Sequence, residues 1–166
     1  WTASSGGCGG SSSPAARAAN QAARDTLGKF SDMLRYQLYE CNTQTIDIKK
    51  ELQYLKNYTE LQQLRVNENF SVQFTCSSQL SGFAIPPLLM LPLVENAFKH
   101  VSHYTDRKNE IIIQLTLNRP HLQLHISNTR EASVRIENGG IGLRNVKRRL
   151  DLIYGDQCQL HIEDTI

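Results

Sequence analysis

Two short segments of the sequence carry residue types that suit the binding of a metal ion together with a triphosphate. The first is residues 91–100, LPLVENAFKH, and the second is residues 139–149, GGIGLRNVKRR. In the first segment Asn96, Lys99 and His100 lie three and four residues apart, so a helix would place them on one face. An amide oxygen beside a cationic side chain suits Mg²⁺ and phosphate, although a solvated polar helix face has the same pattern.

The second segment offers clustered glycines at the start of an expected helix. Gly139, Gly140 and Gly142 give the backbone freedom to approach a ligand closely, and the first N–H groups of a helix attract phosphate oxygens. Glycines of this kind also mark ordinary helix-entry loops. Taken singly, each segment therefore leaves a binding site and a plain structural element equally open.

Hydrophobic spacing predicts two helices ahead of these segments. Residues 14–39 are expected to form an amphipathic helix that opens with Pro14, and residues 47–65 are expected to form a second one. The apolar stripe of the first helix consists of Leu27, Phe30, Met33, Leu34 and Leu38. The stripe of the second consists of Ile48, Leu52, Leu55, Tyr58, Leu61 and Leu64. These helices could pair in a homodimer or pack on their own domain.

The remainder of the chain reads as alternating strands and helices. Strands are expected at residues 70–75, 110–117, 121–127 and 158–162, with a hairpin turn at residues 118–120. Helices are expected at residues 88–100 and 142–154. This order predicts an α+β fold, a two-layer sandwich with helices on one face of the sheet, preceded by a helical segment.

Composition divides the chain into three parts. Residues 1–13 are rich in Gly and Ser and read as a flexible linker or tag. Residues 14–66 are expected to be a helical dimerisation or linker region, and residues 67–166 a ligand-binding domain. Because such a sandwich should close with another strand after residues 161–166, HIEDTI, this domain is expected to be truncated at its C-terminus.

Charge and hydropathy argue against two classes of partner. The formal net charge is only +2, from 18 basic and 16 acidic residues, so no strong field is available to steer nucleic acid or a membrane surface. The most apolar run, residues 83–98, is broken by three prolines and is too short and polar to span a bilayer. We therefore expect a cytoplasmic domain that would reach a membrane only through other parts of its parent.

Together the two segments resemble the LytS-like class of sensor histidine kinases, within the GHKL superfamily of ATP-binding domains. The resemblance runs from about residue 30 to 166 and includes the segments LRYQLYE, ELQYLKNYTELQQLR, IPPLLMLPLVENA and GIGLRNVKRRLDLIYG. Residues 91–100 resemble the family's N box, which implies ATP and Mg²⁺ as cofactors and Asn96 as the metal ligand. Residues 139–145 resemble its G2 box. The implied nucleotide-binding residues are Asn96, Lys99, His100, Asn128, Gly140, Gly142, Leu143, Arg144 and Asn145.

The sequence departs from the family pattern at the base-reading turn. The family's aspartate opens a D-x-G turn, and Asn128 stands in its place with no glycine following. Its amide oxygen could accept a hydrogen bond from adenine, about one kcal/mol more weakly than a carboxylate. Residues 130–138 would form the ATP lid. Glu95 is a candidate general base or partner of Asn96, although it points about 100° away around a helix.

No phospho-acceptor histidine is recognisable. The resemblance to this class implies a Pro-His-Phe acceptor motif well upstream of the LRY segment. In this sequence, by contrast, the five histidines all lie at residue 100 or beyond. The expected function is phosphoryl transfer from ATP to a histidine that is not recognisable in this chain, for relay to a response regulator. The alternative is a non-catalytic dimerisation module with weak or no nucleotide binding. A chaperone- or topoisomerase-type ATPase is disfavoured, because Pro92 stands where those enzymes carry glutamate.

Overall fold

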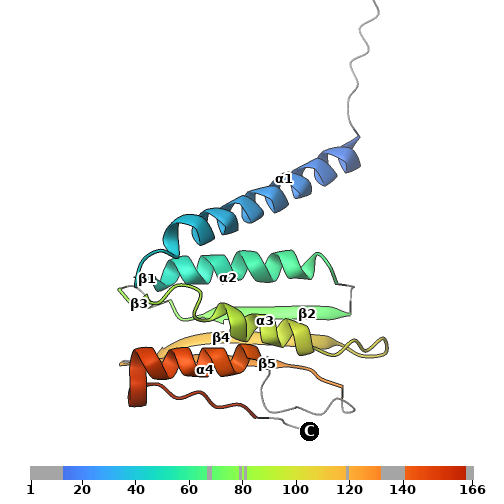
Figure 1. Ribbon diagram of the computed structural model, residues 1–166. Helices are drawn as coiled ribbons and strands as arrows, with labels where there is room; N and C mark the ends of the chain where they lie inside the picture. The colour runs from blue at the N-terminus through green and yellow to red at the C-terminus, as the bar shows by residue number, and fades with distance from the viewer. Residues whose placement is uncertain are drawn as a thin grey trace, which may run out of the picture.

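The computed structural model of this protein describes residues 13–66, 69–78, 80, 82–118, 120–131 and 141–163. Its helices are α1 Pro14–Arg35, α2 Ile48–Gln63, α3 Leu91–His100 and α4 Ile141–Tyr154 (Figure 1). Its strands are β1 Ile46–Asp47, β2 Phe70–Cys76, β3 Ala84–Ile85, β4 Asn109–Asn118 and β5 His121–Asn128. Helices and strands thus combine in an α+β fold, which confirms the predicted class.

Strands β2, β4 and β5 form the main sheet, in that order. β2 runs parallel to β4, with Phe70 opposite Asn109. β4 and β5 are antiparallel, and Asn118 opposite His121 closes the predicted hairpin; residue 119 of its turn lies outside the described residues. Parallel neighbours in a sheet need a crossover connection, and here the segment that connects β2 to β4 contains α3.

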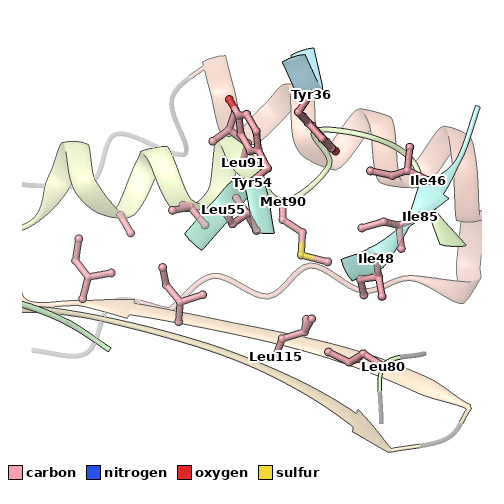
Figure 2. Packing of buried hydrophobic residues seen from close by; sticks show 14 of the residues in the cluster. Tyr36, Ile46, Ile48, Tyr54, Leu55, Leu80, Ile85, Met90, Leu91 and Leu115 are labelled. Atoms are coloured by element: carbon pink, nitrogen blue, oxygen red, sulfur yellow. The ribbon is translucent and has the colours of Figure 1, made fainter. Parts of the chain in front are cut away.

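One face of this sheet is covered by helices. Along β4, Ile111, Ile113 and Leu115 are at most 1% exposed, whereas Gln114 and Thr116 between them are exposed. The buried side chains of β4 share one core with residues of α2 and α3, as Figure 2 shows from close by. This alternation is the period-two pattern of a strand with one dry and one wet face, and it fixes where α3 lies.

Local capping chemistry sets where the first two helices begin. The Ser13 hydroxyl accepts a hydrogen bond from the Ala16 N–H at 3.2 Å, and Pro14 occupies the first helical position. The Asp47 carboxylate accepts from the Lys49 N–H at 2.9 Å at the start of α2. At its other end α1 continues into a single π-helical turn, Tyr36–Glu40, which delivers Tyr36 into the core.

The apolar stripe of α1 is mostly left uncovered by the described residues. Leu27 is 67% exposed, Phe30 52% and Leu38 64%, and Met33 alone of the stripe is half-buried against the core. α1 lies along α2, where the Lys29 ammonium and the Glu60 carboxylate are 2.7 Å apart. The predicted helix is therefore confirmed, but its apolar face does not pack on the described part of its own domain.

Three sequence expectations about secondary structure differ from the structure. Residues 158–162, predicted as a strand, form none: they are mostly exposed and pair with none of the described strands, and a short alternating run needs a partner edge to become a strand. The helix predicted from residue 88 begins at Leu91, because Leu88 has a positive φ of 54°. The antiparallel pair β1–β3 was not predicted, since two residues carry no periodic signal.

Because of the contact between Tyr36 and α2, we expect the free energy of unfolding to fall at alkaline pH. The Tyr36 hydroxyl donates to the Glu51 carboxylate, and burial first, then this carboxylate, raise the pKa of Tyr36 above its ordinary value of 10.0. The resulting stability is fully present below pH 10.0 and is lost as pH rises above it, because only the unfolded phenol ionises there. Between pH 8 and pH 11, the free energy of unfolding measured in urea should fall less for Tyr36→Phe than for the parent protein. Equal losses in both proteins would contradict this assignment.

Candidate nucleotide-binding site

Helix α3 has one buried and one exposed face, and Asn96 lies at their boundary. Leu91, Val94 and Ala97 are buried in the core at three-residue spacing, whereas Lys99 and His100 are exposed. Pro92 in the first turn suits the start of this helix, where its missing N–H is not needed. The sequence therefore presents the polar residues of the N box on a helix whose back is anchored to the sheet.

The Asn96 side chain has no hydrogen-bond partner within the described part of the chain. It is half-buried, and the hydrogen bonds around α3 among the described residues are all made by other groups. Half-buried amides usually bind protein or water, so an amide without a protein partner is well suited to bind a ligand. Lys99 likewise forms no ion pair with any described residue.

Glu95 lies on the side of α3 that faces α2. After burial, the largest cause, its carboxylate helps to raise the pKa of the hydroxyls of Tyr54 and Tyr58, two tyrosines of α2. Glu95 itself is exposed and forms no ion pair among the described residues. This placement gives no support to its predicted role as a general base next to Asn96.

Asn128, the last residue of β5, is tied directly to the end of the N-box helix. Its Nδ2 donates to the His100 carbonyl at 3.2 Å and to the Thr129 carbonyl at 3.1 Å. The His100 carbonyl is one of the terminal carbonyls of α3 that lack an intrahelical partner, so Asn128 caps the helix. Within the described residues the Asn128 Oδ1 accepts nothing, which leaves that oxygen for a ligand.

A buried polar cluster that sequence reasoning missed holds this junction together. The Ser102 hydroxyl bonds to Asn109 Oδ1 and to Thr129 Oγ1, both at 2.8 Å, and Ser102 and Asn109 are each 2% exposed. Thr129 Oγ1 also accepts from the Glu110 N–H at 2.9 Å. The cluster joins the end of α3 to the ends of β4 and β5. Small polar residues outside any motif gave no signal in the sequence.

Part of the expected G2 box lies on the first turns of α4. α4 packs beside α3, and Val146 is its buried anchor at 4% exposure (Figure 1). Gly142, Arg144 and Asn145 are exposed and Leu143 is half-buried, so the structure keeps three of these residues open to a ligand. Gly140 and residues 132–138 of the expected lid lie outside the described residues.

Exchanging Asn128 for the family's acid should weaken the protein. Asn128→Asp removes the N–H₂ that serves two carbonyls and places a carboxylate against them, so we expect the free energy of unfolding to fall by about 1–3 kcal/mol. The matched control is Asn118→Asp at the exposed end of β4, with an expected change within about 0.5 kcal/mol. Urea denaturation measures both, and equal stability of Asn128→Asp and the parent would contradict the capping role.

A separate groove lies away from these residues. It has a volume of about 430 Å³ between α2 and β2 and is lined by Lys49, Leu52, Gln53, Lys56, Thr59, Glu60, Gln63, Val72, Phe74 and Cys76. None of the predicted nucleotide-binding residues lines it. Because this groove contains none of the residues of the N-box and G2-box segments, the geometry around α3 is the better candidate site.

Metal and membrane features are limited in the part of the chain that the structure describes. It contains no group of three His, Cys, Asp or Glu side chains close enough to hold a metal ion. A Mg²⁺ that keeps several waters and binds substrate phosphates needs only one or two protein oxygens, which Asn96 can supply. None of the described helices is long and apolar enough to cross a membrane.

Comparison with known proteins matches this arrangement to one family. The family model "Histidine kinase" matches residues 11–70, which contain α1 and α2. The sensor protein LytS of Staphylococcus saprophyticus is 31% identical over 156 residues, covering 86% of this chain and 26% of the relative. LytS of Staphylococcus haemolyticus is 31% identical over 159 residues, covering 88% and 27%. The sensor protein kinase HptS of Staphylococcus aureus is 27% identical over 154 residues, covering 84% and 29%.

The chain belongs to the histidine kinases, in the LytS-like class of sensor proteins. The resemblance recognised in the N-box and G2-box segments is thereby confirmed at the level of the family. The chain spans between a quarter and three tenths of the length of the relatives it matches.

Proposed function

We propose that this chain is the ATP-binding part of a two-component sensor histidine kinase, and that it supplies the γ-phosphoryl group to a histidine outside residues 91–163. Residues 14–66 would be the helical dimerisation or linker region and residues 67–166 the catalytic domain. The covered sheet with α3 and α4 side by side is compatible with the two-layer sandwich of the GHKL superfamily. Family membership supports the general activity of the parent protein.

The observation that carries the proposal is the half-buried, unpartnered Asn96 beside two other candidate elements. Asn128 at the end of β5 bonds to the last residue of the same helix, and the exposed first turns of α4 lie alongside it. Three elements from distant parts of the sequence therefore bring an amide oxygen, a base-facing amide and a helix start into one region. Such convergence of polar groups is typical of a ligand site.

Each residue has a defined task in this proposal. Asn96 Oδ1 would hold Mg²⁺, which when bound neutralises charge on the phosphates. The Lys99 ammonium would bind a phosphate oxygen, and the N-terminal turn of α4 from Gly142 to Asn145 would face the phosphates with its positive helix end, aided by Arg144. Asn128 Oδ1 would accept from the adenine amino group. Catalysis would then consist mainly of positioning and charge stabilisation while the γ-phosphoryl group passes from ATP to an imidazole nitrogen of the acceptor histidine.

Partners and location follow from the same proposal. A response regulator would receive the phosphoryl group, the parent would be anchored in a bacterial inner membrane, and this part would face the cytoplasm. The exposed apolar stripe of α1, with Leu27, Phe30 and Leu38, supports pairing with a second copy.

Calorimetric titration with a non-hydrolysable ATP analogue, with Mg²⁺ and with EDTA, tests the proposal. Micromolar to sub-millimolar affinity that requires Mg²⁺ is expected, followed by phosphoryl transfer to an acceptor-bearing fragment of a LytS-like kinase supplied in trans. A folded chain that binds no nucleotide would instead favour the second candidate, a non-catalytic dimerisation module. That candidate is supported by the uncovered stripe of α1 and by an Asn128 whose amide nitrogen is already committed to two carbonyls.

A further inference from the structure

The loop of residues 86–90, which leads from β3 into α3, is held in an unusual conformation. Leu88 has a positive φ of 54°, a region that non-glycine residues with large side chains rarely enter. Pro86, Pro87, Leu89 and Met90 are all buried, so the loop is packed on the core and not free at the surface. A backbone of this kind persists only where its surroundings fix it.

Glu51 of α2 fixes the loop from one side. This side chain is 0% exposed, and its Oε2 accepts from the Leu88 N–H at 2.8 Å while its Oε1 accepts from the Met90 N–H at 3.1 Å. The Tyr36 hydroxyl donates to the same Oε2. A buried carboxylate is tolerated because each oxygen accepts hydrogen bonds, and the contacts of Glu51 therefore specify the loop geometry.

Arg149 of α4 fixes the same loop from the other side. Its Nη2 donates to the Pro87 carbonyl at 2.7 Å and its Nη1 to the Leu88 carbonyl at 3.2 Å. The N–H of Leu88 is thus held by α2, and the carbonyl of Leu88 is held by α4. A guanidinium suits this task because its planar fork can serve two acceptors at once.

The loop passes directly into the N-box helix. Met90 is the residue before Leu91, the first residue of α3, so the Glu51 carboxylate lies at the positive end of that helix and satisfies an N–H that has no intrahelical partner. Since α3 is short, with ten residues, a shift of its first turn moves Asn96 with it. Figure 2 shows Met90 and Leu91 entering the same core as Tyr36 and Tyr54.

We propose that Glu51 is a positioning residue for the nucleotide site, and that Tyr36 makes its hold on α3 depend on the end of α1. This inference rests on the proposed function for its consequence, ATP affinity, but not for its mechanical part. The Tyr36 hydroxyl connects the end of α1 to Glu51, so a rotation of α1 against α2 removes a donor from the carboxylate that holds the loop. The end of α1 is thereby connected to Asn96.

A neighbouring contact of the same kind does not reach the loop and serves as the control. The Tyr54 ring lies 4.7 Å from the Tyr36 ring, and its hydroxyl accepts from Gln37 Nε2 at 2.7 Å. Tyr54→Phe removes a hydroxyl from the same core and the same α1–α2 junction, but it leaves Glu51 and its three donors in place. Tyr36→Phe removes the hydroxyl that donates to Glu51 and keeps the aromatic ring.

The experiment compares Glu51→Gln, Tyr36→Phe and Tyr54→Phe in the full chain by hydrogen exchange and by titration with an Mg²⁺–ATP analogue. Glutamine keeps the size of Glu51 but places an N–H₂ where one oxygen accepts. We expect faster amide exchange at residues 88–94 for Glu51→Gln and Tyr36→Phe, with strands β4 and β5 unchanged, and no such change for Tyr54→Phe. Affinity should fall about tenfold for Glu51→Gln and about threefold for Tyr36→Phe.

The two readouts separate the possible failures. If the parent chain binds no nucleotide, the proposed function fails, and exchange at residues 88–94 still decides whether Glu51 and Tyr36 position α3. If Glu51→Gln does not fold, Tyr36→Phe alone decides the matter. Exchange that rises equally over the whole molecule, or equally in Tyr54→Phe, overturns the inference. So does unchanged affinity in a folded Glu51→Gln whose parent binds the analogue.

Discussion

Asn96→Ala should weaken Mg²⁺-dependent binding of an ATP analogue by about a hundredfold or more, which corresponds to about 2.7 kcal/mol. Asn96 is the proposed protein ligand of the metal. Its half-buried amide has no hydrogen-bond partner in the described part of the chain. The residual affinity would come from the contacts proposed for Asn128, Lys99 and the start of α4, and it would no longer respond to EDTA. Calorimetric titration of the variant with and without Mg²⁺ measures this directly.

The same lack of a partner predicts that the fold will tolerate the change. Removing a side chain that bonds to nothing in the described residues should alter the free energy of unfolding by no more than about 0.5 kcal/mol. Gln114→Ala is the matched control, since Gln114 is an exposed amide on the outer face of β4 and should leave nucleotide affinity unaltered. An Asn96→Ala protein that binds the analogue like its parent would remove Asn96 from the site.

Leu55→Ala should lower the free energy of unfolding by about 2–5 kcal/mol. Leu55 is 0% exposed and lies between α2 and the sheet, where the neighbouring side chains cannot collapse fully into the space that the substitution leaves (Figure 2). A loss of this size is a large share of the stability of a domain of this kind. Urea denaturation followed by circular dichroism gives the value.

Leu64→Ala is the control for this prediction. Leu64 belongs to the same predicted stripe of α2 but is 66% exposed at the end of the helix, so its replacement should change stability by no more than about 0.5 kcal/mol. Equal losses for the two variants would mean that the core does not lie where the structure has it.

The hydrophobic spacing predicted the elements well, because burial of an apolar face is a repeated signal. In α2 it correctly placed Ile48 and Leu55 in the core, each 0% exposed. It failed for Leu64, because α2 ends at Gln63 and Leu64 is the exposed C-cap residue that follows it. It also gave no hint that Glu51 is fully buried, since a charged residue on a helix is normally solvated and only its tertiary partners reverse that preference.

The candidate site was predicted from the sequence only as a set of residue types. Asn96 and Asn128 were singled out by motif, and the structure places Asn128 in contact with the end of the helix that bears Asn96. The residues that make this contact possible, Ser102 and Thr129 among them, lie in no motif and act through side-chain bonds between distant segments. Such contacts depend on the chain path, which local patterns do not encode.

The parallel pairing of β2 with β4 also shapes how the chain folds. Phe70 meets Asn109 across a segment that includes the whole of α3, so this pairing must close a long loop before any of its hydrogen bonds form. The N-box helix therefore lies within a long loop that has to close before this pairing forms. A nucleotide held by α3 binds only after that loop has closed, and mass action would then favour the closed state. Bound ligand would consequently lower the rate of unfolding and leave the rate of folding almost unchanged.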